Sequence, residues 1–240
     1  IRLDALEEAV RAHKPKLLYT VPNFQNPTGV TLSLPRRQAI ADMASQYNFV
    51  IAEDDPYRGL RYAGKPLPTI YSFDRQGRTV YLTSFSKLIS PGLRVGAVVT
   101  PNPVLLRKLT VGKQSADVHT PSLVQAIAAE YLSRGLLPDH MEAICGRYRV
   151  QLLRMLDALS DFPEGVTCTR PDGGLFVWVE LPKRCDAVRM LRRAIDRGVA
   201  YVPGTYFYAD GGHLNTLRLN FSSSEPEAID RGMAILKACI

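Results

Sequence analysis

The sequence has few of the features that mark several classes of protein. It contains 4 cysteines in 240 residues, with no CxxC pair and no regular spacing, which excludes a disulfide scaffold and favours reduced thiols in the cytoplasm. No apolar run approaches the ~20 residues that a membrane span needs, and we expect no signal peptide. Neither GxGxxG nor GxxxxGK(S/T) occurs, so a conventional nucleotide-binding loop has no support.

The composition that remains is that of an ordinary globular protein. Hydrophobic residues make up 46% and charged residues 22%, which excludes a wholly disordered, collagen-like or coiled-coil chain. The net charge of +7 comes from scattered basic residues, so we expect a small anionic ligand and neither a nucleic-acid nor a membrane partner. Because the chain starts with Ile1, inside an expected helix, we also expect a preceding N-terminal part to be missing.

The first half of the chain alternates between expected helices and short apolar runs. Helices are expected over 4–13 and from Ser33 and Pro35 onward, with Ile40, Met43, Ala44 and Tyr47 on one face. This order predicts an α/β fold with a mostly parallel sheet covered on both faces. The last two strands are too close in sequence for a helical crossover, so we expect them to be antiparallel. The expected strands are 17–21, 49–52, 80–82 and 95–99.

The second half predicts a smaller α+β domain. Two helices over 121–134 and 138–159 lead into it, and we place the domain change inside the second of them, giving domains 1–150 and 151–240. Short strands are expected at 166–169, 175–181, 199–202 and 217–221, with helices over 187–196 and 225–238.

Polar residues follow three of the strands in the first half. Asn26 comes after the first, Asp54 and Tyr57 after the second, and Ser84, Ser86 and Lys87 after the third. Each motif alone is more often a turn or a solvated loop, and Arg94 and Arg218 alone have equally ordinary interpretations. Because ligands bind at the carboxyl ends of strands in open parallel sheets, their occurrence at successive strand ends predicts one shared crevice.

The chemistry of this set is that of pyridoxal phosphate. A lysine forms a Schiff base with an aldehyde, and a carboxylate keeps a pyridine nitrogen protonated. A phenol and an amide hydrogen-bond a ring oxygen, and two serines with an arginine hold a phosphate.

The motifs resemble those of the fold-type I class I/II aminotransferases, across essentially the whole chain. They are Asn26-Pro27-Thr28-Gly29, Asp54-x-x-Tyr57, Ser84-x-Ser86-Lys87, Pro91-Gly92-Leu93-Arg94 and Asn215-x-x-Arg218. The segments 53–57, 113–121 and 202–204 resemble the 2-aminoadipate and broad-range branch of that family.

The resemblance implies a role for each site residue. Lys87 carries the Schiff base and moves a proton, Asp54 pairs with the pyridine nitrogen, and Tyr57 and Asn26 hydrogen-bond the 3-oxygen. Ser84, Ser86 and Arg94 bind the phosphate, and Arg218, assisted by Asn26, binds the substrate carboxylate. The resemblance also implies a homodimer, and an upstream segment with outer strands, a phosphate loop and a ring-stacking aromatic residue. No metal site is expected.

Three functions fit these residues. The leading one is transfer of an amino group between an L-amino acid and a 2-oxo acid. A second is the effector domain of a winged-helix transcription regulator, which a helix-turn-helix upstream of Ile1 would reveal. A third is a pyridoxal-phosphate-dependent lyase of the same fold, since a fold alone does not fix the reaction.

Overall fold

The computed structural model describes residues 1–240, which form two compact units. Unit 1 comprises Ile1–Asn23, Thr31–Gly59 and Lys65–Met141. Unit 2 comprises Phe24–Val30, Leu60–Gly64 and Glu142–Ile240, so two short segments from the first half of the sequence fold with the second half.

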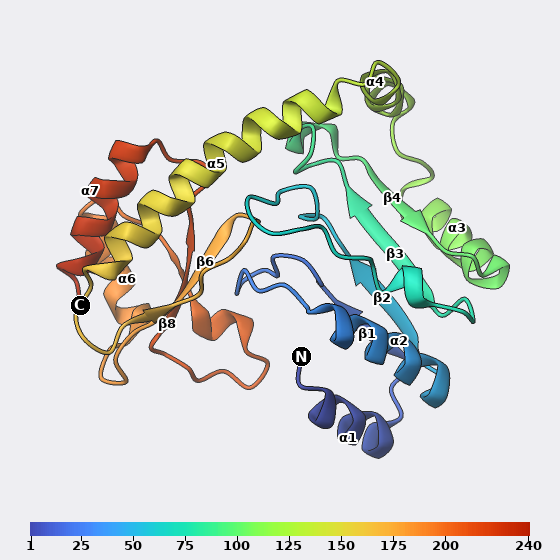
Figure 1. The fold of residues 1–240 in the computed structure, drawn as a ribbon, viewed down its shortest axis with the longest axis horizontal. Helices are drawn as coiled ribbons and strands as arrows, with labels where there is room; N and C mark the ends of the chain where they lie inside the picture. Colours follow the sequence, from blue (N-terminus) through green and yellow to red (C-terminus); the bar gives the residue numbers. More distant parts are fainter. The chain divides into compact units, whose positions relative to one another are not determined.

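Unit 1 is built on a four-stranded sheet in the order β1-β2-β3-β4 (Figure 1). The first three strands are parallel, and β4 is antiparallel to β3, which confirms the prediction from the short connection. The strands are β1 (Leu17–Thr20), β2 (Val50–Asp54), β3 (Thr79–Ser84) and β4 (Gly96–Val99).

Two helices cover one face of this sheet. α1 (Leu3–His13) and α2 (Leu34–Tyr47) lie beside each other, and their apolar residues form a core with Ile51 of β2. Ser33 occupies the cap position of α2 and Pro35 its first turn, although the serine side chain makes no capping bond. On β1, Leu17 and Tyr19 are 55% and 59% exposed, so the expected cover on both faces is wrong for this strand. The alternation of a strand sends these two side chains away from the helical face.

Unit 1 also contains a helix that we did not predict from the sequence. α3 (Pro103–Asp117) starts at Asn102, whose side chain accepts hydrogen bonds from the backbone N–H groups of Val104 and Leu105. An asparagine cap followed by proline is a helix start, so the signal was present in the sequence. The remaining elements of this unit are α4 (Ser122–Ser133) and two single 3₁₀ turns, η1 (Tyr71–Phe73) and η2 (Pro91–Leu93).

Unit 2 has an antiparallel sheet in the order β5-β6-β8-β7. Buried side chains on one face, such as Val177 and Leu217, pack with buried residues of three helices. The expected strand over 199–202 is wrong in its bounds, because the chain is still leaving the turn at Gly198 and pairs only from Val202. The elements are β5 (Thr167–Cys168), β6 (Phe176–Glu180), β7 (Val202–Pro203), β8 (Thr216–Asn220), α5 (Leu137–Ser160, which begins in unit 1), α6 (Ala187–Asp196), α7 (Pro226–Lys237) and η3 (Gly204–Phe207).

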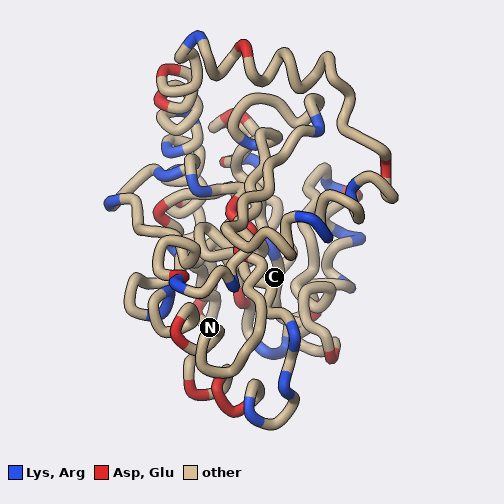
Figure 2. The backbone as a smooth tube through the Cα atoms, turned by 90° about the vertical axis from the view of Figure 1, so that its right-hand side faces the viewer, with Lys and Arg blue, Asp and Glu red and all other residues tan.

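Charged residues are interspersed along the backbone, with basic and acidic positions close to one another (Figure 2). None of the helices combines the length and the apolar character required for crossing a membrane. The four cysteines form no disulfide bonds.

Candidate active site

The register of the unit 1 sheet brings the predicted cofactor residues to one edge. Asp54 at the end of β2 pairs with Leu82 of β3, two residues before that strand ends at Ser84. Ser84 in turn pairs with Gly96, the first residue of β4. The turns after β2 and β3 and the residues just before β4 therefore lie at the same edge of the sheet, as the strand order requires.

Asp54 accepts a hydrogen bond from a residue that sequence reasoning missed. The Tyr19 hydroxyl donates to Asp54 Oδ2 at 2.5 Å. Partial desolvation of the hydroxyl and, secondly, the bond to Asp54 raise the pKa of Tyr19 to about 12, so the phenol stays protonated and remains a donor. The signal was available, because in a parallel pair the side chains of Tyr19 on β1 and Asp54 on β2 share a face of the sheet.

Asp55, the next residue, is buried in a separate set of contacts. Asn23 Nδ2 donates to its Oδ1 at 2.7 Å, and Arg58 lies 3.7 Å from its Oδ2. Burial raises the pKa of Asp55, and Asn23 and Arg58 act against that rise. Asp55 is 1% exposed whereas Asp54 is only half-buried, so of the two carboxylates Asp54 is the one accessible to a ligand. Tyr57 follows in the same turn and is buried.

The serines, Lys87 and Arg94 share the connection between β3 and β4. The Ser86 backbone N–H donates to Ser84 Oγ at 3.2 Å, and Arg94 Nη1 donates to Ser86 Oγ at 3.5 Å. The turn that holds Lys87 is closed by the Ile89 N–H, which donates to the Phe85 carbonyl at 2.8 Å. Lys87 itself is exposed. Two hydroxyls and a guanidinium in one turn are suited to a phosphate group.

A buried arginine ties the loops at this edge together. Arg37 on α2 is fully buried and donates to the carbonyls of Leu32 and Pro68, each at 2.8 Å. Its Nη2 also donates to Asn23 Oδ1 at 2.7 Å, and Asn23 Nδ2 in turn donates to Asp55 Oδ1. Because this side chain satisfies backbone groups of separate loops, it fixes the segments that follow β1 and β2.

Replacing Arg37 with methionine is expected to lower the free energy of unfolding by about 3–5 kcal/mol, because it leaves buried acceptors without their donor. Burial raises the pKa of both Glu53 and Asp55, and Arg37 opposes that rise. In the variant the folded-state pKa values rise further, so the deficit should be larger at pH 8 than near pH 3, where both carboxyls are protonated in the folded wild type and in the folded variant. Urea unfolding at the two pH values measures both effects.

Arg36→Met is the matched control, because this neighbouring arginine is exposed. It should change stability by less than about 0.5 kcal/mol. Equal losses for the two variants, or a deficit for Arg37→Met that is independent of pH, would contradict this account of the buried charges.

Unit 2 contains the predicted carboxylate-binding pair. Arg218 lies on β8 opposite Trp178 of β6, and its Nη1 donates to Asn26 Oδ1 at 2.6 Å. The guanidinium carbon lies 4.2 Å from the centre of the Phe176 ring and 5.2 Å from that of Phe207. Two aromatic rings and an amide thus hold a planar cation that can bind a carboxylate through two parallel hydrogen bonds.

The structure therefore groups the predicted site residues into two sets. Unit 1 contains Asp54, Tyr57, Ser84, Ser86, Lys87 and Arg94, and unit 2 contains Asn26 and Arg218. Sequence reasoning missed Tyr19, Arg37 and the two phenylalanines beside Arg218. The role of each residue in binding or catalysis remains a prediction.

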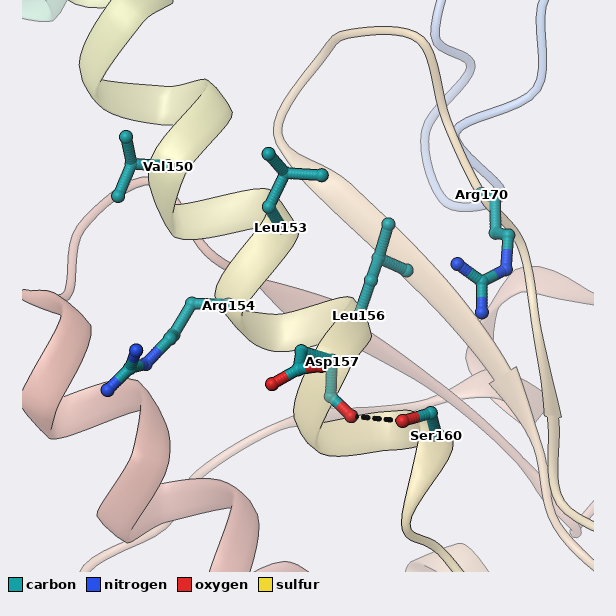
Figure 3. Close-up of a pocket in the computed structure, with 7 residues that line it drawn as sticks. All are labelled: Val150, Leu153, Arg154, Leu156, Asp157, Ser160 and Arg170. Carbon is teal, nitrogen blue, oxygen red and sulfur yellow. Dashed lines mark hydrogen bonds between the residues drawn. The ribbon is translucent and has the colours of Figure 1, made fainter.

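A groove on α5 is lined by residues other than those predicted for the site (Figure 3). It has a volume of about 560 Å³ and contains none of the predicted site residues. Its apolar lining comes from α5, where Arg154 extends toward α7 and pairs with Asp230 at 2.6 Å. With Arg154 already paired and no lysine or histidine in its lining, this groove offers no comparable set of reactive groups. It is lined by Val150, Leu153, Arg154, Leu156, Asp157, Ser160 and Arg170.

Comparison with known proteins gives a consistent result. The model of the family described as aminotransferase class I and II matches residues 1–236. An aromatic-amino-acid aminotransferase 1 from Thermococcus litoralis is 43% identical over 246 residues, covering 100% of this chain and 59% of the relative. A 2-aminoadipate transaminase from Thermus thermophilus is 43% identical over 235 residues, covering 96% of this chain and 59% of the relative.

Among solved structures, the crystal structure of Pyrococcus horikoshii kynurenine aminotransferase, in complex with PMP, superposes with a TM-score of 0.95. It is 42% identical, and the match covers 100% of this chain and 60% of that one. The chain thus spans about three-fifths of the length of these proteins.

Proposed function

Because this chain belongs to the class I and II aminotransferase family, we propose that the protein moves an amino group between an L-amino acid and a 2-oxo acid with pyridoxal phosphate. The observation that carries the proposal is the set of acid, hydroxyl, amine and guanidinium groups at one edge of the unit 1 sheet. Within the proposal, residues 1–150 belong to the cofactor-binding domain and 151–240 to the small domain. We further propose a cytoplasmic homodimer.

The residues present fit the cofactor. Asp54 is a half-buried carboxylate held by the Tyr19 hydroxyl, which suits a partner for the pyridine nitrogen. Ser84, Ser86 and Arg94 would hold the phosphate, and Tyr57 with Asn26 would donate to the ring oxygen. When bound, the cofactor supplies an aldehyde carbon and a ring that accepts electrons from the substrate.

The chain's own residues supply binding, orientation and proton transfer. Arg218 and Asn26 orient the substrate through its α-carboxylate, which every amino-acid and 2-oxo-acid partner shares. Lys87 would take the proton from the substrate Cα and deliver it to the cofactor C4′, since an amine free to move on a flexible stem can serve as base and acid in turn. Tyr19 holds the Asp54 carboxylate in position through its hydrogen bond to Oδ2.

Transfer of nitrogen to an acceptor tests this proposal against the alternatives. The purified protein is supplied with pyridoxal phosphate, 2-oxoglutarate and single L-amino acids, including aromatic amino acids and 2-aminoadipate. We expect glutamate and the matching oxo acid in equal amounts. Oxo acid formed without an acceptor would indicate a lyase, and cofactor binding without turnover over the whole panel would favour the regulator.

Asp54→Asn is expected to retain part of the cofactor but to lower the single-turnover rate by roughly 10²–10³-fold. An amide has no negative charge with which to keep the pyridine nitrogen protonated, and the ring then accepts electrons less well. Rapid-mixing absorbance with one amino acid measures the rate, and cofactor content is measured separately. An unchanged rate would assign the role to Asp55 instead, despite its burial against Asn23.

A further inference from the structure

The segment that carries Asn26 is held in unit 2 by one buried side chain. Phe24 is completely buried, and its backbone has a φ of 49°, a conformation that few residues other than glycine adopt. A bulky residue in that conformation is retained only where its surroundings hold it, so the contacts of Phe24 show what positions this turn.

Phe24 packs against two consecutive glycines. A Cβ atom placed on Gly173 would lie 2.5 Å from Phe24 Cζ, and one on Gly174 would lie 3.3 Å from Phe24 Cγ. The first distance is a clash and the second is tighter than an ordinary contact, so the phenylalanine side chain occupies the space that the glycines leave. The Arg61 guanidinium carbon lies 4.8 Å from the centre of the same ring.

The glycine pair is itself anchored. The Gly174 N–H donates to the Leu60 carbonyl at 2.8 Å, and the Tyr62 hydroxyl donates to the Gly174 carbonyl. The N–H groups of Tyr62 and Ala63 both donate to the Asp172 carbonyl, at 2.7 and 3.0 Å. Hydrogen bonds thus fix the backbone against which Phe24 packs. We call this backbone, Gly173 and Gly174, the seat of Phe24.

Two of the three side chains around Arg218, those of Asn26 and Phe176, are close in sequence to this seat. Asn26, which accepts from Arg218 at 2.6 Å, is two residues after Phe24. Phe176, whose ring lies 4.2 Å from the Arg218 guanidinium carbon, is two residues after Gly174. Gly29 closes the turn against the same strand, where a Cβ would lie 2.7 Å from the Phe176 carbonyl oxygen.

We propose that Phe24, seated on Gly173 and Gly174, is a positioning residue that sets Asn26 and Arg218 at the spacing a substrate carboxylate requires. The inference rests on the proposed function and adds a residue that does not touch the substrate. Loss of the seat would displace Asn26 and Phe176 relative to the guanidinium, and small displacements of oriented groups are costly. The effect should therefore fall mainly on carboxylate recognition, because the proposed cofactor-binding residues other than Asn26 belong to unit 1.

Phe24→Leu tests this in the cofactor-loaded protein. We expect KM for both the amino acid and the oxo acid to rise by about 10-fold or more, with kcat changed less than about 3-fold. The reaction with an amine that lacks the carboxylate should change much less than the reaction with the amino acid. The affinity for 3-phenylpropionate, measured by calorimetry, should fall by the same factor as the KM values, which reports on the site without turnover.

Phe49→Leu is the matched control, since Phe49 is equally buried but belongs to the unit 1 core. Gly29→Ala, at a φ of 71°, is a second way to displace the turn and should reproduce the effect if Phe24→Leu fails to fold. Equal changes in Phe24→Leu and Phe49→Leu, or unchanged affinity for 3-phenylpropionate in Phe24→Leu, would overturn the inference. A wild-type protein without amino transfer would instead overturn the proposed function.

Discussion

Replacing Lys87 with alanine is expected to lower kcat by roughly 10²–10⁴-fold, the contribution typical of a positioned group that transfers protons. Lys87 is the lysine in the turn that also contains Ser86, and that turn follows the same sheet edge as Asp54. Alanine removes the only group proposed to take the proton from the substrate Cα, and no neighbouring side chain of this turn replaces it. Steady-state and single-turnover kinetics with one amino acid measure the loss.

The assignment has a chemical test that does not depend on turnover. Reduction of the protein with borohydride in the presence of pyridoxal phosphate, followed by peptide mapping, should leave the pyridoxyl group on Lys87. Lys113→Ala is the control variant, because this exposed lysine pairs with Asp117 at 2.5 Å. The protein that lacks the Lys113 side chain should have wild-type kinetics. A pyridoxyl group on Lys108 or Lys113, with Lys87 unmodified, would exclude the assignment.

Replacing Arg218 with alanine is expected to lower kcat/KM by the equivalent of roughly 2–5 kcal/mol, the range for removing one member of a buried charge pair. This corresponds to a roughly 30- to 5,000-fold loss. The Arg218 guanidinium is held by Asn26 at 2.6 Å and by the rings of Phe176 and Phe207, so its orientation is already set before a carboxylate arrives. Kinetics with amino acid and oxo acid should show the loss, while the bound cofactor measured by absorbance stays close to the wild-type amount.

Two further variants make this result interpretable. Arg218→Lys keeps the charge but not the planar pair of donors, so it should recover only part of the activity. Arg170→Ala removes an exposed arginine of the same unit and should leave kcat/KM unchanged. Loss of cofactor with wild-type kcat/KM in Arg218→Ala would mean that Arg218 serves the cofactor and not the substrate.

The sequence by itself determined the order of the elements and the residues at the sheet edge. Apolar runs such as 17–20 and 79–84 marked the strands, and the short connection after Ser84 forces β4 to run antiparallel. The polar residues that follow β2 and β3 were assigned to one edge because parallel strands end on the same side. Such inferences need only local pattern and chain direction.

Tertiary structure alone decided which side chains touch. The hydrogen bond between Asn26 and Arg218 joins residues 192 positions apart. Arg37 resembles an ordinary surface arginine in the sequence of its helix, yet it is buried because it satisfies carbonyl groups of loops that the helix does not contain. Phe24 and Gly174 are similarly far apart in sequence. Contacts of this kind depend on how separate segments pack, and a local sequence pattern contains no information about such packing.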